Sequence, residues 1–187
     1  MRMGGASAPP LCFLLLLNEK TFYKMGHIDE LLVTKIGGQL DLKNSSLKGI
    51  TTLTATASIL AADSGKTLLV GPAAAGLAAD SVATLPTAEE GLYYRFIYAG
   101  NAADGHDLQL NTGSDTNFFI GGIAHYDTDT DDTNGIPDAV FPDGDSNSKL
   151  NVLTPSAGSV VECYCDGTNW ILWGQVCSAS APTFADQ

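Results

Sequence analysis

The sequence predicts an all-β fold, in which an extended N-terminal arm precedes a β-sandwich or jelly-roll-like body. Short apolar or alternating segments follow one another at the spacing of about 8–12 residues that is typical of sandwiches. Turn-forming residues separate them, and no segment has the 3.6-residue period of an amphipathic helix. The chain of 187 residues contains 20 glycines. These observations predict one domain, with the arm and first strands in residues 1–57 and the sandwich body in residues 58–187.

The first half of the chain contains several candidate strands. Residues 31–36 are apolar and end at Gly37–Gly38, and residues 39–43 alternate strictly between apolar and polar. Residues 50–60 predict one or two strands and residues 67–70 another. Residues 73–83 are rich in Ala and Gly and predict a loop or a short helix.

The clearest strand covers residues 91–98, GLYYRFIY. Alternation places Leu92, Tyr94, Phe96 and Tyr98 on one face of it. Later strands are predicted at residues 107–111, 118–123, 149–153, 159–165 and 170–176. The sequence DGTN between the last two is a hairpin turn signal, and the tail from Ser178 is predicted to be exposed.

Charge is distributed unevenly along the chain. Residues 1–60 contain six Lys/Arg and four Asp/Glu, a net +2, whereas residues 61–187 contain three and seventeen, a net −14, which together give −12. An acidic body disfavours nucleic-acid binding, which needs clustered basic residues. Charged residues make up 16% of the chain, against about 25% in average domains, which suggests that partner subunits cover part of the surface.

The first residues resemble a targeting segment. Residues 11–17, LCFLLLL, are apolar, but the run is too short to span a bilayer, and no small-residue cleavage site follows it. Three interpretations remain: a hydrophobic arm that packs on a neighbouring subunit, a signal peptide, and translation that begins at Met25. We expect the arm, and no membrane partner.

Two motifs resemble ligand sites only in part. Gly65-Lys66-Thr67 matches the end of a P-loop, but Leu60 occupies the position of the first glycine and Gly71-Pro72 ends the following run. We therefore expect a turn that leads into a strand. Zinc is disfavoured because Cys163 and Cys165 have only a distant third cysteine beside them, and reduced thiols of a protein assembled in the cytosol are expected instead.

The sharpest local signal is the aspartate-rich run of residues 126–138, YDTDTDDTNGIPD. Its spacing resembles the calcium loops of EF-hand, dockerin and thrombospondin type 3 modules, and it makes Asp127, Asp129, Asp131 and Asp138 candidate Ca²⁺ ligands. It departs from an EF-hand because Asp132 stands where a glycine is expected. The favoured interpretation is a solvated acidic loop without metal, and Ca²⁺ binding is the alternative. The acidic turn of residues 143–145 is a candidate source of a further ligand.

Catalytic signals are weak, and we expect no enzyme. His106 and Asp107 are adjacent and serines are plentiful, but the chain has no G-x-S-x-G nucleophile elbow. Glu89 and Glu90 are neighbours in a turn, which fits poorly to the paired carboxylates of a glycosidase. Several aromatic residues offer either a sugar-stacking platform or core and interface packing: Tyr93, Tyr94, Tyr98, Trp170 and Trp173.

Three motifs recur in this order in a family of small structural proteins of tailed phages. They are SGKTLLV at residues 64–70, TLPTAEEGLYYRF at residues 84–96 and DGTNW at residues 166–170. The chain resembles the head-decoration, or cement, proteins of this family over about residues 58–176. It departs from them in its first 24 residues and in an apparent insertion at residues 77–81.

The resemblance implies a trimeric β-rich protein on the outer surface of the capsid, with an arm that contacts the major capsid protein. The expected location is the virion, after assembly in the host cytoplasm. Apolar residues of the first segment are the expected interface: Leu14, Leu31, Leu32, Ile36, Leu40 and Leu42. The alternative function is a carbohydrate- or receptor-binding module of a tail fibre or secreted protein.

Overall fold

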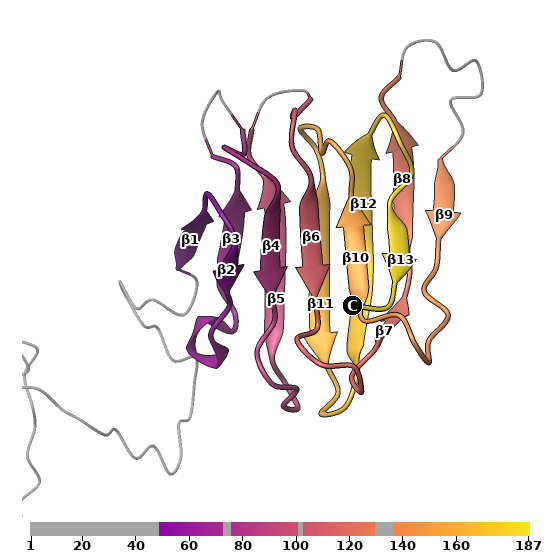
Figure 1. The fold of residues 1–187 in the computed structure, drawn as a ribbon. Helices are drawn as coiled ribbons and strands as arrows, with labels where there is room; N and C mark the ends of the chain where they lie inside the picture. The colour runs from indigo at the N-terminus through magenta and orange to yellow at the C-terminus, as the bar shows by residue number, and fades with distance from the viewer. Residues whose placement is uncertain (1–48, 73–75, 101–102, 130–136) are drawn as a thin grey trace, which may run out of the picture. The chain divides into compact units, whose positions relative to one another are not determined.

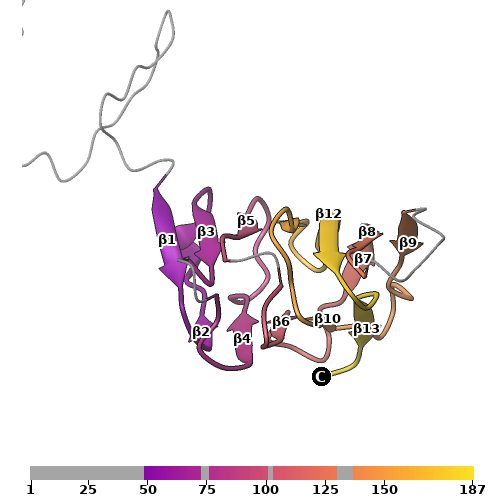
Figure 2. The same ribbon diagram turned by 90° about the horizontal axis from the view of Figure 1, so that it is seen from above.

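The structure is a computed structural model that describes residues 49–72, 76–100, 103–129 and 137–187. The chain divides into two units, Met1–Lys43 and Asn44–Gln187, and every described residue belongs to the second. This unit is a two-layer β-sandwich, seen face-on in Figure 1 and from above in Figure 2. The predicted all-β sandwich is confirmed.

The larger layer, sheet A, has the strand order β1-β3-β5-β11-β12-β8-β9, and the short strand β7 pairs with the first half of β12. Its strands are β1 (Ile50–Leu53), β3 (Thr67–Val70), β5 (Tyr93–Tyr98), β7 (Phe119–Gly121), β8 (Ile123–Asp127), β9 (Asp138–Val140), β11 (Val160–Cys165) and β12 (Trp170–Ser178).

The smaller layer, sheet B, has the order β13-β10-β6-β4-β2. Its strands are β2 (Ala57–Ser58), β4 (Ser81–Thr84), β6 (Leu108–Asn111), β10 (Lys149–Val152) and β13 (Thr183–Ala185). A short 3₁₀ helix at Ala61–Asp63 links β2 to β3.

The first six strands alternate between the two sheets. β1, β3 and β5 lie side by side in sheet A, and β2, β4 and β6 lie side by side in sheet B, each parallel to its neighbour. Parallel neighbours need a long crossover connection. Here the intervening strand of the opposite sheet supplies it, so the chain winds around the core three times. Antiparallel pairing of β10 with β6 and β13, and of β11 with β5 and β12, then extends the layers. β7 and β8 pair in parallel with β12, and β9 pairs antiparallel with β8.

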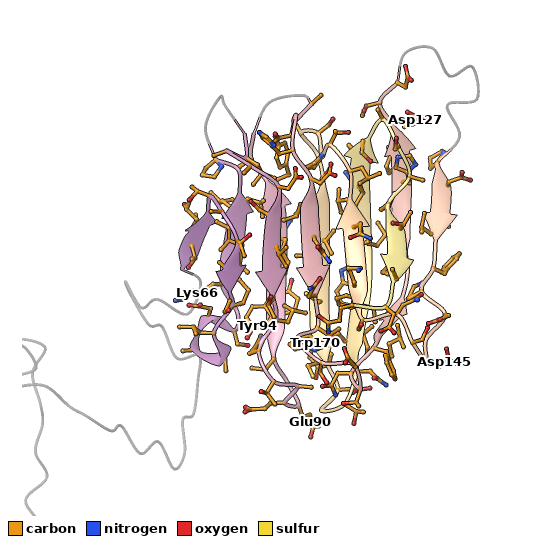
Figure 3. The ribbon with its side chains drawn as sticks, viewed as in Figure 1. Lys66, Glu90, Tyr94, Asp127, Asp145 and Trp170 are labelled. Carbon is orange, nitrogen blue, oxygen red and sulfur yellow. The ribbon has the colours of Figure 1, made fainter. Side chains whose placement is uncertain are left out.

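The core lies between the sheets and follows from the alternation of each strand. In β5 the side chains of Tyr94, Phe96 and Tyr98 are buried, whereas their neighbours point outward. Trp170 of β12 is fully buried and packs against Tyr94, with ring centroids 5.9 Å apart (Figure 3). Burial of each such large side chain contributes about 1.5–3 kcal/mol.

Several predicted strands match the structure closely, and two regions differ. The segment 73–83, predicted as a loop or short helix, contains the start of β4. The tail, predicted to be exposed, contains β13, which pairs with β10 while Phe184 packs against Phe119. Both strands are only four and three residues long, too short for a period-two pattern to stand out in the sequence. β1 precedes the expected boundary at residue 57, and β2 spans it; the strands predicted at residues 31–43 lie outside the described residues.

A glycine in β12 provides a test of the pairing between β11 and β12. Gly174 has a φ of 145°, and a Cβ placed on it would overlap the carbonyl oxygen of Val160. We expect Gly174→Ala to lower the free energy of unfolding by at least about 2 kcal/mol in urea denaturation.

Gly105→Ala is the matched control, because a Cβ at Gly105 meets no atom within 4 Å. We expect it to change stability by less than about 0.5 kcal/mol. Equal stability of the two variants would contradict the close approach of β11 to β12.

Candidate functional site

The outward side of the four central strands of sheet A carries an unusual concentration of apolar and aromatic side chains. We call it the sheet A face. It consists of Thr67 and Leu69 of β3, Tyr93, Arg95 and Ile97 of β5, Val160, Glu162 and Tyr164 of β11, and Ile171, Trp173 and Gln175 of β12. Nothing in the described part of the chain packs over it, and Trp173 and Tyr164 are 51% and 38% exposed.

Strand register arranges these side chains in rows that run across the strands. One row contains Thr67, Arg95, Glu162 and Trp173, because Arg95 pairs with both Thr67 and Glu162, and Glu162 pairs with Trp173. Residues in such cross-strand positions lie about 4.5–5.5 Å apart at their Cβ atoms and contact one another.

Glu162 is the polar centre of the sheet A face. Its Oε1 lies 3.2 Å from Nε of Arg95, and its Oε2 accepts a hydrogen bond of 2.6 Å from the indole Nε1–H of Trp173. Burial raises the pKa of the Tyr93 phenol, and the neighbouring Glu162 carboxylate raises it further. Glu162 of β11 therefore contacts side chains of both neighbouring strands, Arg95 of β5 and Trp173 of β12.

A shallow hollow of about 390 Å³ lies over this row. Arg95, Val160, Glu162, Trp173 and Gln175 line it, together with Ala124 of β8 and Gly174. A cavity of only about 10 Å³ lies between the two sheets, beside Val70, Phe96 and Val152, and is too small for a ligand.

The sheet A face is electrically neutral, since Arg95 and Glu162 are its only charged residues and form an ion pair. Residues 61–187 carry a net −14 overall. A neutral, aromatic patch within a strongly acidic body has the composition of a protein contact surface, where Trp, Tyr and Arg are enriched.

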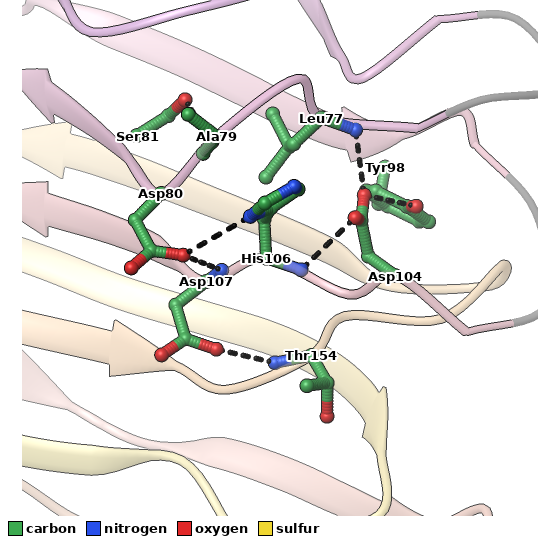
Figure 4. Close-up of polar contacts among 9 residues, drawn as sticks. All are labelled: Leu77, Ala79, Asp80, Ser81, Tyr98, Asp104, His106, Asp107 and Thr154. Carbon is green, nitrogen blue, oxygen red and sulfur yellow. Dashed lines mark hydrogen bonds and ion pairs between the residues drawn. The ribbon is translucent and has the colours of Figure 1, made fainter.

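Loops at one end of the sandwich contain a separate polar network, centred on Asp104 (Figure 4). Asp104 is 7% exposed. Its carboxylate accepts hydrogen bonds from the backbone N–H of Leu77 (2.7 Å), the hydroxyl of Tyr98 (2.6 Å) and the backbone N–H of His106 (3.1 Å). Burial alone raises the pKa of this carboxyl, but these hydrogen bonds outweigh burial and hold the pKa below its ordinary value.

His106 and Asp107 belong to the same network and connect neighbouring loops. Nδ1 of His106 lies 3.5 Å from Asp80, whereas the Asp107 carboxylate accepts the backbone N–H of Thr154. The neighbouring Ser81 hydroxyl donates to the backbone oxygen of Ala79. These groups join loops to one another, and Ser81 makes no hydrogen bond to His106 of the kind that activates a nucleophile.

The predicted calcium residues lie around the connection between β8 and β9. Asp127 ends β8 and Asp138 begins β9, and the Asp129 backbone N–H donates to Asp127 Oδ1. Asp131 lies outside the described residues. Within the described residues, no three acidic, His or Cys side chains form a metal-binding group. The turn at residues 143–145 cannot add a ligand, because Asp145 and Asp127 lie at opposite ends of the sandwich (Figure 3).

Other sequence predictions have clear outcomes. Ser64 and Gly65 form a turn into β3, and Lys66 is paired with Asp63 at 2.6 Å, so this segment is not a P-loop.

The two tryptophans differ in exposure, since Trp170 is buried in the core and Trp173 is exposed. Arg95 and Glu162 were not predicted to be site residues. Each stands between two apolar residues of an alternating strand, a pattern that indicates an outward side chain. The six predicted interface residues, from Leu14 to Leu42, lie outside the described residues.

Comparison with protein-family models, with curated proteins and with solved structures found no match for this chain. In the described residues, no helix has the length and apolar character needed to cross a bilayer.

The buried Asp104 carboxylate predicts a pH-dependent effect. Its folded-state pKa is depressed, so its contribution is present above the unfolded-state pKa of about 3.9 and is lost as pH falls through the folded value. We expect Asp104→Asn to cost about 1–3 kcal/mol at pH 7, because donors of Leu77, Tyr98 or His106 lose their acceptor. The difference from wild type, measured by urea denaturation, should shrink below pH 4.

Asp80→Asn is the control for this effect, because the Asp80 side chain is 76% exposed. We expect it to change stability less and to leave the acid branch of the stability profile as in the wild type. A constant cost of Asp104→Asn from pH 7 to pH 3 would refute the role of its ionised form.

The calcium hypothesis predicts heat on titration with Ca²⁺ and a higher melting temperature, because a ligand that binds only the folded state stabilises it. Asp127→Asn and Asp129→Asn should each reduce both signals, whereas Asp145→Asn, at the other end of the sandwich, should leave them unchanged. No heat and an unchanged melting temperature would end the hypothesis.

Proposed function

We propose that this chain is a non-enzymatic structural protein of a phage virion, which binds the outside of the assembled head and stabilises it. The motifs that resemble head-decoration proteins are far apart in the sequence. In the fold the first motif lies on β3, the second runs from the end of β4 into β5, and the third forms the turn of the β11–β12 hairpin; β3, β5, β11 and β12 are consecutive strands of sheet A. The resemblance therefore concerns one continuous part of the sandwich.

The observation that carries the proposal is the uncovered sheet A face. Its aromatic and aliphatic side chains form an open surface with only a shallow hollow, which favours a protein partner over a small molecule. A partner that binds only the assembled shell stabilises the shell by its binding free energy. This mechanism needs complementary surfaces and no reacting groups.

The expected partners are the major capsid protein and further copies of the chain, for which the family resemblance implies a trimer. In this proposal the first segment, residues 1–57, contacts the shell. The acidic body disfavours nucleic acid as a partner, since it would repel phosphates.

The cysteines support assembly in the host cytoplasm. Cys163, Cys165 and Cys177 are free, and burial raises the pKa of each thiol. Such thiols stay protonated and unreactive at neutral pH. Free buried thiols fit a reducing compartment, followed by incorporation into the virion.

The direct test is the amount of the protein in purified virions. We expect on the order of hundreds of copies per head, because a closed lattice offers many equivalent positions. Quantitative mass spectrometry measures the ratio to the major capsid protein, and removal of the chain should lower the temperature at which heads release DNA. A handful of copies per particle would contradict a decoration role.

Trp173 favours a second candidate function, a carbohydrate- or receptor-binding module. Its half-exposed indole is held by Glu162 at the edge of the hollow, where Arg95 and Gln175 supply polar groups. A sugar ring that stacks on Trp173 should change its fluorescence. Absence from heads, together with glycan binding that Trp173→Ala abolishes, would favour this function over decoration.

A further inference from the structure

We propose that two copies of this chain associate through their sheet A faces, about a two-fold axis that runs parallel to the strands between β5 and β11. The inference rests on the proposed role of the sheet A face as a protein contact and names its occupant, a second copy, in a two-fold pair in place of the trimer that the family resemblance implies. The observation behind it is a chemical match between the outward residues of these two strands.

Three outward pairs lie side by side on β5 and β11. Register places Tyr93 beside Tyr164, Arg95 beside Glu162 and Ile97 beside Val160. Each pair contains either similar or complementary side chains: two phenols, two opposite charges and two β-branched aliphatics.

A two-fold axis between the strands exchanges β5 with β11 when one face is laid on the other. Each side chain then lies opposite its own row partner in the other copy. Tyr93 meets Tyr164, Arg95 meets Glu162, and Ile97 meets Val160, and every contact occurs twice because the interface is isologous.

The flanking strands fit the same operation. β3 lies next to β5, and β12 lies next to β11. The two-fold axis therefore also exchanges β3 with β12, and the large Trp173 side chain of one copy lies opposite the small Thr67 of the other. A large residue that faces a small one allows two flat faces to interdigitate, as the inner faces of a sandwich do at a spacing of about 10 Å. Trp173 is then the central aromatic anchor that interfaces favour.

The ion pair of the sheet A face favours a second copy as the occupant, because Arg95 and Glu162 are complementary to themselves across the proposed axis. Two bodies that each carry a net −14 over residues 61–187 repel one another, and the sheet A face is a neutral surface through which they can approach. The Arg95 side chain is 46% exposed and that of Glu162 is 19% exposed. In the dimer Arg95 and Glu162 each gain a second partner of opposite charge, so the interface buries no unpaired charge.

The available area is sufficient for a weak, specific dimer. Outward positions are spaced about 4.8 Å across strands and about 6.8 Å along them, so the face with its flanking strands β1, β7 and β8 covers roughly 500 Å² per copy. The total of about 1,000 Å² is at the lower limit for a specific interface. We therefore expect association in the micromolar range and dissociation on dilution.

The test uses the full chain in sedimentation velocity and light scattering at concentrations up to about 100 µM, well above the expected micromolar dissociation constant. Wild type should be a concentration-dependent dimer. Arg95→Glu and Glu162→Arg should each be monomeric, with association weakened at least about 100-fold, because both cross-contacts become repulsive. An equimolar mixture of the two variants should form a heterodimer, since two carboxylates of the first variant then face two guanidinium groups of the second.

The equimolar mixture separates a role in association from a role in folding. Residues 95 and 162 of each variant chain still carry like charges in the mixture, so a heterodimer can form only through contacts between the two chains. Lys149→Glu is the matched control: it makes the same change of net charge as Arg95→Glu, but from β10 of sheet B, and should remain dimeric. Melting curves show whether each charge variant folds. If one does not, Trp173→Ala provides a second test, because it removes an exposed side chain and should also give monomers.

A monomeric wild type at the highest concentration, a trimer, or an oligomer unaffected by both charge variants would each overturn the proposal. A trimer would instead agree with the family resemblance. A monomer in solution that is abundant on virions would refute only the pairing, whereas a dimer absent from virions would refute only the decoration role.

Discussion

The strict alternation of side chains along β5, β11 and β12 is the constraint on which the rest of the structure depends. Burial of Tyr94, Phe96, Trp170 and Leu172 fixes the inner side of these strands, and a shift of register by one residue would expose all of them. The same constraint fixes the outer side, because every residue between two buried ones points away from the core. The sheet A face is thus held in place by the core beneath it, and the positions of Arg95, Glu162 and Trp173 need no loop to define them.

The winding of the first six strands explains how distant motifs come together. Because β2 and β4 lie in the opposite sheet, the chain returns to sheet A beside its own earlier strand, and β3 and β5 become parallel neighbours. β11 then joins β5 from the other side, across more than 60 residues of sequence. Such non-local pairing closes long loops before it gains contacts, which favours slow folding. It also means that the sheet A face forms only when the whole sandwich forms.

Much of sheet A could be predicted from the sequence, and the reasons for the failures are physical. β5, β11 and β12 combine period-two alternation with aromatic and β-branched residues, so their position and their buried side were predictable. β4 and β13 are too short to show a period-two pattern, and they are fixed by pairing with neighbouring strands, which a local pattern does not reveal. Trp170 and Trp173 lie on opposite sides of β12 because they are three residues apart and the side chains of a strand alternate between its two faces. The cluster around Glu162 requires the register between three strands, and no local pattern contains that information.

The acidic composition of the body also has a structural origin. Aspartates at the ends of strands accept backbone N–H groups that turns leave unpaired: Asp63, Asp80, Asp104, Asp107, Asp127, Asp143 and Asp166. Asp104, Asp127 and Asp166 accept from residues two or three positions ahead, as short Asp side chains do in turns. Asp80 and Asp107 instead accept from distant segments and join loops to one another. A sandwich with many turns therefore accumulates negative charge at its loops. Of the three basic residues in residues 61–187, Lys66 neutralises Asp63 and Arg95 neutralises Glu162. The loops consequently repel acidic surfaces, and the neutral side of sheet A is where another protein with the same charge can approach.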